Sequence, residues 1–299
     1  MLLVTGATGF VGAHLIQRLR KFDVPVRAIV RNDNKAGLIK DLGVEIVSGD
    51  LSDKATLEQA AQGCERVVHL VGIIQETAGA TFQDVHVEGT RNIIGAAQKA
   101  GVRHFFYQSA LGTRPGAKST YHKTKWEAEE IVRHSGMPFT ILRPSLIFGP
   151  GDQFTLKLSE VIRLSPVLPI IGSGKSKVQP IFIDDVVSCI VKAVTSESFL
   201  NEMFEIGGPE QPTYEEVNIA IAEVMGIRRP LLHLPLRFLK TTAGLLDAVL
   251  PNPPVTYDQL IMLQEDNICS MRDIHDAFGI EPIKFREGLS KFIRKTAGK

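Results

Sequence analysis

The chain has 299 residues, of which 44% are hydrophobic and 22% charged, with no internal repeat and no low-complexity tract. This composition excludes disordered, collagen-like and coiled-coil proteins, and it is typical of one large globular domain or two ordinary ones. The formal net charge of +1 gives no global field that would attract nucleic acid or an anionic membrane. Three widely spaced cysteines form neither a disulfide framework nor a metal-binding pair, which favours reduced thiols in the cytoplasm.

The first half of the chain alternates strand-like and helix-like segments. Strands are expected at 1–5, Val26–Val30, Val44–Val47, Val67–Val71, His104–Gln108 and Phe139–Leu142. Helices are expected at Phe10–Lys21, Ala55–Gln62, Phe82–Ala100 and Tyr121–His134. This alternation indicates βαβ units and a parallel sheet, because the strands are apolar on both faces. The predicted fold class is therefore α/β, a doubly wound parallel sheet of the Rossmann type.

Prolines and glycines interrupt the pattern from residue 144 onward. Helices are expected at Thr155–Leu164, Asp184–Thr195, Tyr214–Met225 and Arg286–Lys295, and strands at Val178–Ile183 and Met203–Ile206. This pattern predicts a dinucleotide-binding domain over residues 1–150 and a smaller, mostly helical lobe over residues 151–299. The late strands of that lobe are expected to return to the sheet.

A glycine-rich turn, Thr5–Gly12, follows the first strand and opens the first helix. Gly6 permits a tight turn, Gly9 lets the backbone approach a pyrophosphate, and Gly12 allows the helix to pack closely on the strand. The helix N-terminus then offers free N–H groups and partial positive charge to phosphates. The predicted cofactor-binding residues of this turn are Gly6, Thr8, Gly9, Phe10, Val11 and Gly12.

The end of the second strand bears on which dinucleotide is bound. NAD-binding proteins usually place Asp or Glu there to hold the ribose 2′-hydroxyl, whereas this chain has Arg31. A planar, permanently charged guanidinium suits a 2′-phosphate. Asp33 and Asp50 are the acids that would argue for NAD, but neither lies at the strand end. We therefore expect NADP as the cofactor, with NAD as the second choice.

A tyrosine and a lysine, Tyr121 and Lys125, are spaced to share one face of a predicted helix. A tyrosine hydroxyl with its usual pKa of ~10 is a poor base at neutral pH. A nearby ammonium and an oxidised nicotinamide would favour the tyrosinate, so that Tyr121 can exchange a proton while hydride moves. Lys125 would also hold the nicotinamide ribose.

Together these residues resemble the short-chain dehydrogenase/reductase superfamily, in its extended or atypical branch. The turn Thr5–Gly12 matches TGxxGxxG, and Tyr121 with Lys125 matches YxxxK. Further matches are Gly49–Leu51, His69–Gly72, Arg143-Pro144 with Phe148–Gly151, and Ile181–Val186. The resemblance implies that Asp50 accepts from the adenine amino group. It also implies cofactor contacts from Leu51, Leu70, Val71, Gly72 and Pro144.

Within this superfamily the chain looks most like the group that contains the accessory nucleotide-binding subunit of respiratory complex I and its bacterial relatives. The segments that carry this resemblance are Gly72–Gln75, His86–Asn92, Ser109–Gly112 and Leu263–Asn267. Two positions depart from the usual pattern. Ala110 stands where extended members usually have Ser or Thr, so Ser109 is the candidate catalytic hydroxyl beside Tyr121 and Lys125. Thr113 and Ser119 are the alternative hydroxyls. His86 stands where Asn is common.

Five other features bear on the candidate site. The eight histidines lack HxxxH or HxH spacing, so no metal site is predicted. His122 is expected to face solvent, with the substrate as the alternative, and Arg143 is expected to end a strand in a structural salt bridge. The loop Gly172–Lys177 is expected to be an exposed basic loop, with contact to a substrate phosphate as the alternative. Leu231–Leu250 is expected to be a core-facing helix, with a lid or a membrane-contacting patch for a quinone-like substrate as the alternative.

Three functions are compatible with these residues. The first is an NADP-dependent oxidoreductase that uses Tyr121 and Lys125. The second is a non-catalytic nucleotide-binding accessory or assembly protein of a respiratory or quinone system, which Ala110 favours. The third is a sugar-nucleotide epimerase or dehydratase. The opening residues lack the pattern of a signal peptide and no apolar run is long enough to span a membrane, so we expect a cytoplasmic protein, with peripheral contact at the inner face of the membrane as the alternative. The sequence does not indicate the substrate or the oligomeric state.

Overall fold

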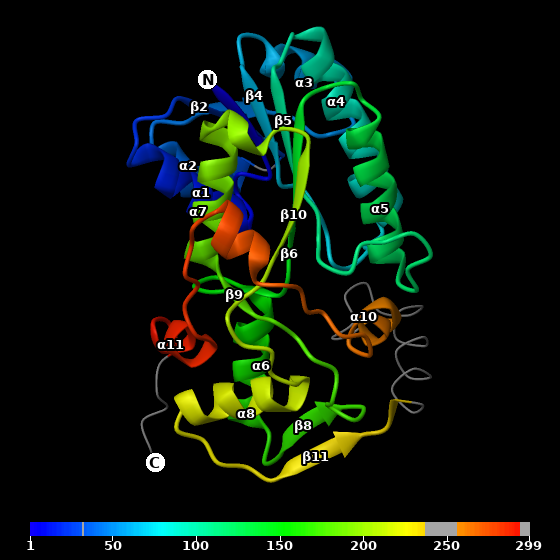
Figure 1. Ribbon diagram of the computed structural model, residues 1–299, viewed down its shortest axis with the longest axis vertical. Coiled ribbons are helices and arrows are strands. Elements are labelled where there is room, and N and C mark those ends of the chain that lie inside the picture. Colours follow the sequence, from blue (N-terminus) through cyan, green and yellow to red (C-terminus); the bar gives the residue numbers. More distant parts are fainter. Residues whose placement is uncertain (32, 237–255, 294–299) are drawn as a thin grey trace. The chain divides into compact units, whose positions relative to one another are not determined.

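A seven-stranded sheet is the central feature of the computed structural model, which describes residues 1–31, 33–236 and 256–293 (Figure 1). Its strands are β1 (Leu2–Thr5), β2 (Val26–Val30), β3 (Glu45–Ser48), β4 (Arg66–His69), β5 (His104–Gln108), β6 (Phe139–Pro144) and β10 (Glu202–Ile206). Their spatial order is β10-β6-β5-β4-β1-β2-β3, and the registers from β6 to β3 are parallel. Asn201 N donates to Phe139 O and Ser145 N donates to Ile206 O, so β10 also runs parallel to β6. The predicted doubly wound parallel sheet is confirmed.

Helices cover both faces of this sheet. They are α1 (Phe10–Arg20), α2 (Asp33–Lys40), α3 (Lys54–Ala61), α4 (Gly89–Lys99), α5 (Thr120–Arg133) and α7 (Ile183–Thr195). Figure 1 shows α3, α4 and α5 on one side of the strands and α1 and α7 on the other. The core beneath α3, α4 and α5 includes Leu57, Ile93 and Val132, packed against Phe105 and Tyr107 of β5. Both faces of the inner strands β1, β4 and β5 are therefore buried, as their apolar sequences predict, whereas the edge strands β3 and β10 are partly exposed.

Two elements differ from the sequence-based expectation. The helix expected over Phe82–Ala100 begins as a π-helical segment, η1 (Gln83–Glu88), and becomes α-helical only in α4. Such wide turns often mark functional sites, and this one carries the buried His86. The helix α2 was not predicted, because its sequence combines Gly37 with a single apolar pair and shows no helical period.

The chain divides into two compact units, which do not follow one another simply along the sequence. Unit 1 contains Met1–Arg143 and Val187–Phe204, with the short helix η2 (Glu197–Phe199) after α7. Unit 2 contains Pro144–Val186 and Glu205–Lys299. The sequence-based division into a dinucleotide-binding domain (1–150) and a smaller lobe (151–299) stays a prediction.

Unit 2 combines small parallel ladders with short capped helices. Its strands are β7 (Ile147–Phe148), β8 (Leu168–Ile171), β9 (Ile181–Phe182) and β11 (Leu231–Leu234), in the pairs β7–β9 and β8–β11. Its helices are α6 (Gln153–Leu164), α8 (Tyr214–Val224), α10 (Tyr257–Met262), η3 (Asp273–Ala277) and α11 (Phe285–Ser290). The Asp152 side chain caps α6, and a Thr213–Glu216 capping box begins α8. The strand expected at Val178–Ile183 shrinks to β9, since α7 already begins at Ile183.

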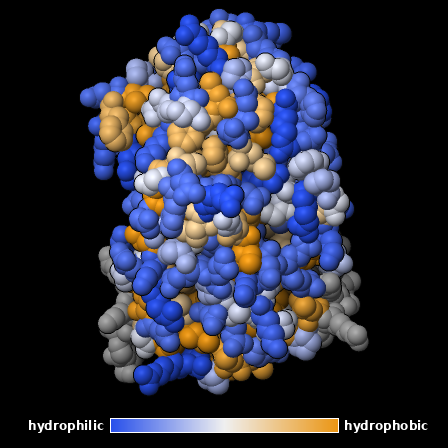
Figure 2. Space-filling model, in the orientation of Figure 1, coloured by the Kyte–Doolittle hydropathy of each residue, from blue (hydrophilic) through white to orange (hydrophobic). Residues whose placement is uncertain are grey.

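Surface hydrophobic residues are scattered over both units. On the face in Figure 2 they form small groups separated by hydrophilic residues, and Phe22 and Leu164 are among the most exposed. Within the described residues, no helix is both long enough and apolar enough to cross a membrane. Most of Leu231–Leu250, the predicted core-facing helix with a lid or membrane-contacting patch as the alternative, lies outside the described residues. Its first residues form β11, so they are not helical.

Candidate functional site

The glycine turn joins β1 to α1 at the carboxyl edge of the sheet. Gly6 has φ +78°, and a side-chain carbon there would lie 3.0 Å from the backbone of Leu70 and Val71. A carbon on Gly12 would lie 2.1 Å from Gly6 O, so only glycine fits. Gly9 is exposed, no side chain among the described residues caps its helix, and the first turn of α1 holds no acid. The turn therefore presents uncapped backbone N–H groups, which suits an anionic pyrophosphate.

Arg31 and Asp50 lie together at the carboxyl ends of β2 and β3. Arg31 Nη1 is 4.0 Å from Asp50 Oδ2, and the arginine side chain is 73% exposed. Asp50 Oδ1 accepts from Ser52 N at 3.0 Å, and Leu51 O accepts from Asn92 Nδ2 at 2.9 Å. These bonds fix the backbone around the predicted adenine contact, while the guanidinium stays accessible to an anionic ligand.

The segment after β4, Leu70–Gly72, lies in space between the glycine turn and helix α5. Its residues Leu70 and Val71 pass directly beside Gly6, and Leu70 N donates to Thr5 O. A side-chain carbon on Gly72 would lie 3.5 Å from Lys125 Nζ and 3.6 Å from His86 Nε2. The predicted cofactor-contacting residues on this segment therefore lie between the turn and the predicted catalytic lysine.

Lys125 is buried, and its ammonium has an unusual set of partners. Nζ donates to Gln108 O at 2.8 Å and to Tyr107 Oη at 3.2 Å, and it lies 4.7 Å from the centroid of the Tyr107 ring. Burial lowers the pKa of Lys125 to about 7, against a smaller opposing effect of Glu129. Near neutral pH, both the charged and the neutral form of Lys125 are therefore populated, beside the end of β5 and next to Ser109.

Tyr121 begins the same helix, one turn before Lys125, and its ring lies among other aromatic rings. The centroids of Phe82, His86 and His122 are 5.9, 5.5 and 5.2 Å away, each in an edge-on arrangement. The Tyr121 side chain is half-buried. Burial raises its pKa to about 12, so the phenol is a proton donor at neutral pH rather than a base.

The predicted hydroxyl of Ser109 is buried next to that of Thr113. Ser109 Oγ donates to Thr113 Oγ1 at 3.4 Å, and Ser109 N donates to Leu142 O, which fixes the backbone beyond β5. Ala110 is partly exposed and has no hydroxyl. The structure thus brings Ser109 to the end of β5 beside the carbonyl that holds Lys125.

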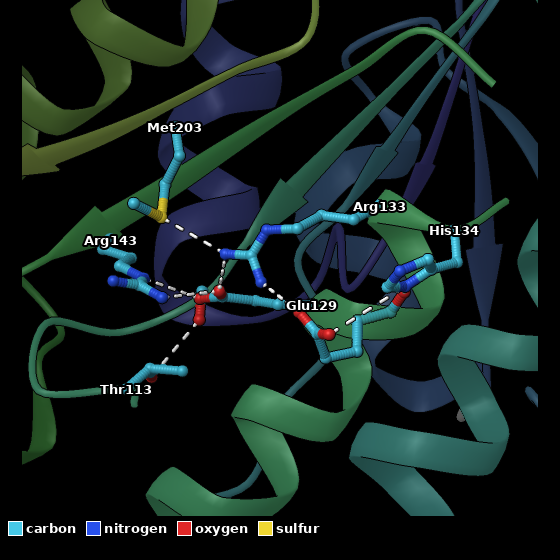
Figure 3. Close-up of polar contacts among 8 residues, drawn as sticks. Thr113, Glu129, Arg133, His134, Arg143 and Met203 are labelled. Atoms are coloured by element: carbon cyan, nitrogen blue, oxygen red, sulfur yellow. Dashed lines mark hydrogen bonds and ion pairs between the residues drawn. The ribbon is translucent and has the colours of Figure 1, made fainter. Parts of the chain in front are cut away.

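A buried ion cluster braces α5 against β6 (Figure 3). The fully buried Glu129 accepts from Arg143 Nε at 2.8 Å and Nη2 at 2.7 Å, and from Arg133 Nη2 at 2.5 Å. The Thr113 side chain points toward the same carboxylate. The predicted structural salt bridge of Arg143 is confirmed, and it fixes the helix that carries Tyr121 and Lys125.

The two histidines near Tyr121 are both buried. His86 Nε2 lies 3.1 Å from the backbone N and O of Ile73, and Nδ1 lies 2.9 Å from Thr124 Oγ1. Burial and the Lys125 charge lower the pKa of His86 to about 2, so it is neutral. The expectation that His122 faces solvent is wrong: it is 6% exposed, because Nδ1 bonds to Ser119 Oγ at 2.9 Å at the helix N-terminus.

Unit 2 holds the remaining candidates. Pro144, the predicted nicotinamide neighbour, is the last residue of β6. The loop Gly172–Lys177 exposes Lys175 and Lys177, as expected, and it borders a cavity of about 420 Å³. The cavity is lined by Ile171, Ser173, Gly174, Lys175, Ser176, Leu236, Leu263, Gln264 and Asp266. Within the described residues, no group of three or more His, Cys, Asp or Glu side chains is placed to hold a metal ion.

Sequence reasoning missed the residues that surround Lys125. Tyr107 read as one of several aromatic residues in a buried strand, and Glu129 as one charge in a polar helix. Only the spacing of Glu129, one turn after Lys125, could have indicated that it lies near the lysine. Nothing in the sequence ties Tyr107 to Lys125, because their contact depends on how β5 and α5 pack.

Residues 6–156, from the glycine turn past the end of β6, match the family described as NAD(P)H-binding. The chain belongs to the NAD(P)H-binding family. A ceramide reductase from Caulobacter vibrioides is 35% identical over 82% of this chain and 77% of its own length. The 40 kDa subunit of NADH-ubiquinone oxidoreductase from Neurospora crassa mitochondria is 28% identical over 86% of this chain and 68% of its own length. This agrees with the resemblance to extended short-chain dehydrogenases/reductases and to the complex I subunit.

The NAD(P)H-binding family also accounts for the fold. An NADPH-dependent quinone oxidoreductase from Escherichia coli, solved with NADPH, superposes with a TM-score of 0.75 over 97% of this chain and 99% of that one. The two sequences are 20% identical, so this likeness concerns the fold alone.

Proposed function

We propose that this protein is an NADPH-dependent reductase of a carbonyl or quinone-like group, with Tyr121 as the proton donor. The observation that carries the proposal is the placement of Tyr121 and Lys125 on successive turns at the start of α5. Lys125 lies beside Gly72, in the segment Leu70–Gly72 that packs against the glycine turn. A proton donor and a cation next to a dinucleotide-binding edge are what a hydride-transfer enzyme requires.

The described residues fit a bound dinucleotide. The uncapped turn at Gly9 would receive the pyrophosphate, and the segment Leu70–Gly72 would line the path toward Lys125. Arg31 would hold a 2′-phosphate, and Lys125 would hold the nicotinamide ribose. When bound, the reduced nicotinamide supplies a hydride to the substrate carbon.

The protonation state of Tyr121 favours reduction over oxidation. Its raised pKa keeps the phenol protonated at neutral pH. As the substrate carbonyl gains negative charge on oxygen, Tyr121 would donate its proton, and the product would be an alcohol or hydroquinone. Lys125 would stabilise the resulting tyrosinate through its positive charge. Ser109 and Thr113 are the hydroxyls available near the end of β5 to orient the substrate oxygen.

The relatives support a reductase and leave a second candidate. The ceramide reductase, at 35% identity, supports the reductive direction and a lipid-like substrate. The complex I subunit, together with Ala110 in place of the usual hydroxyl, favours a non-catalytic nucleotide-binding role instead. The two functions differ in whether turnover depends on Tyr121.

The first prediction concerns Tyr121→Phe, which removes the proton donor and keeps the ring. We expect NADPH-dependent turnover to fall by about 10²–10⁴-fold with the dissociation constant for NADPH little changed. The assay would screen quinones, ceramide-like ketones and nucleotide sugars with the parent protein, then compare the variant on the best substrate. Tyr257→Phe, at an exposed tyrosine of unit 2, is the matched control.

Two variants test cofactor binding and proton donation independently of each other. Gly9→Asp places a carboxylate where the pyrophosphate would approach, so it should abolish NADPH binding while the melting temperature of the free protein is kept. If the parent turns over no substrate but NADPH still raises its melting temperature, the accessory-protein function is correct. If Tyr121→Phe turns over as fast as the parent, Tyr121 is not the donor.

A further inference from the structure

Lys125 is a buried cation without a carboxylate partner. Among the described residues, no Asp or Glu oxygen lies within 4.0 Å of its Nζ, and the nearest acid along its helix, Glu129, is already held by two arginines. An ammonium taken out of water needs hydrogen-bond acceptors in place of the water molecules, because burial otherwise disfavours the charged form. Here the replacements are one carbonyl, Gln108 O, and one phenol, Tyr107.

Tyr107 is suited to this task in two ways. Its hydroxyl accepts from Nζ at 3.2 Å, and the centroid of its ring lies 4.7 Å from the same nitrogen, which is within cation–π range. The ring is fully buried and stacks on His69 with a centroid separation of 5.7 Å. Packing therefore fixes the phenol, and the phenol in turn fixes the ammonium.

A chain of buried hydrogen bonds continues behind Tyr107. The Thr90 side chain acts on the Tyr107 phenol, Thr90 Oγ1 lies 3.2 Å from His69 Nε2, and His69 Nδ1 lies 2.6 Å from Thr5 Oγ1. Thr5 ends β1 and precedes the glycine turn. The chain thus runs from α5 through β5, α4 and β4 to β1, within unit 1.

When Lys125 is protonated, its charge sets the direction of every bond in this chain. An ammonium only donates, so the Tyr107 oxygen must accept and its proton must go to Thr90. Thr90 then donates to His69 Nε2, and the proton on His69 Nδ1 goes to Thr5. Burial and the Lys125 charge lower the pKa of His69 to about 3, which leaves it neutral with one ring proton. Bonds aligned in one direction strengthen one another.

The groups that face Lys125 come from four elements. They are Tyr107 on β5, His69 on β4, His86 on η1 and Glu129 on α5. Both histidines are neutral, and Tyr121 is protonated. Tyr107 is therefore the side chain that directly solvates the ammonium.

We propose that Tyr107 is a positioning residue for Lys125, and that the chain Tyr107–Thr90–His69–Thr5 ties this ammonium to the strand that carries the glycine turn. The role of Lys125 in cofactor binding rests on the proposed function, but its anchoring by Tyr107 does not. Tyr107 holds Nζ at the end of β5, where Gln108 O fixes it from a second side.

The test measures the titration of Lys125 in the full-length protein without cofactor. The ¹³Cε signals of labelled lysine would be followed against pH, with Lys125→Met to assign the resonance. Tyr107→Phe keeps the ring and removes the hydroxyl, so we expect the pKa of Lys125 to fall by about one pH unit or more, the equivalent of a lost charged hydrogen bond. Tyr214→Phe removes the hydroxyl of another buried tyrosine, in unit 2, and should leave this pKa unchanged.

Thr90→Val provides the second arm, and it keeps the test decisive if Tyr107→Phe does not fold. It leaves the bond between Lys125 and Tyr107 but removes the acceptor of the phenol proton. We expect a smaller fall in the same pKa and the loss of a single His69 tautomer in imidazole ¹⁵N shifts. If Tyr107→Phe folds and the pKa of Lys125 is unchanged in it, the proposal is overturned. If Tyr107→Phe does not fold, an unchanged pKa of Lys125 in Thr90→Val overturns it. Retained turnover in Tyr121→Phe would overturn the proposed function and leave this result standing.

Discussion

Arg31 is the residue whose charge bears most directly on the choice of dinucleotide. It directly follows β2, its side chain is 73% exposed, and its neighbour at 4.0 Å is Asp50 rather than a buried acid. An arginine so placed can turn its planar fork to a 2′-phosphate without losing a strong ion pair, since exposed pairs contribute little. The same acid would hold the guanidinium near the ribose in the absence of a phosphate.

The second prediction is that Arg31→Ala weakens NADPH binding much more than NADH binding. We expect the dissociation constant for NADPH to rise about tenfold. This corresponds to the lower end of the free-energy range for a hydrogen bond to a charged group, because the site is exposed. Isothermal titration with both nucleotides measures this, and NADH is the internal control. Equal losses for the two nucleotides, or a parent protein that prefers NADH, would remove Arg31 from the 2′-phosphate site.

At the scale of elements, α5 is the helix on which the site depends. Its first turns carry Tyr121 and Lys125, and its third carries Glu129, which binds Arg143 at the end of β6 (Figure 3). The ion cluster therefore sets the distance of the helix from the sheet. A helix without this anchor would still form, but its first turns would be less precisely placed over the end of β5.

The third prediction concerns Glu129→Gln, which leaves Arg143 buried without its counter-charge. Removing one partner of a buried ion pair costs roughly 3–5 kcal/mol, so we expect the free energy of unfolding in urea to fall by about 3 kcal/mol. Glu130→Gln is the matched control: Glu130 pairs with Arg133 at 2.6 Å but is 38% exposed, and its loss should cost under about 1 kcal/mol. Equal losses in the two variants would show that the buried carboxylate does not anchor the helix.

The sequence was informative where function depends on spacing along one element. The glycines of the turn are three residues apart on a strand–helix junction, and Tyr121 and Lys125 are one helical turn apart. Both patterns can be recognised without knowledge of packing. The partners of Lys125 could not be predicted, because Thr5, His69, Thr90 and Tyr107 come together only through the order of the parallel strands. His122 was misjudged for a different, local reason: its ring bonds to Ser119, the N-cap of the same helix.

At the scale of the whole molecule, burial keeps His69, His86 and His104 in the neutral form. Burial lowers the pKa of His69 to about 3, of His86 to about 2 and of His104 to about 4. In the unfolded chain each would titrate near 6.5. Below that pH the unfolded state binds more protons than the native state, so acid favours unfolding.

The fourth prediction is therefore that stability falls as the pH drops from 6.5 toward 4. Each histidine contributes up to about 1.4 kcal/mol per pH unit, and this contribution is fully present above pH 6.5. Urea unfolding at several pH values measures the slope, and replacing His104 by Gln should reduce it by one proton. A free energy of unfolding that is constant between pH 7 and 5 would contradict the burial of neutral histidines.

The order in which the two units occur along the chain has a consequence for synthesis on the ribosome. Unit 1 ends with Val187–Phe204, which follows Pro144–Val186 of unit 2. Until that last segment emerges, β6 is an edge strand with open N–H and C=O groups, since Asn201 N and β10 have not yet paired with it. Open edges attract other strands. The nascent protein must therefore keep a half-finished sheet from pairing with its neighbours while the first segment of unit 2, Pro144–Val186, is being translated.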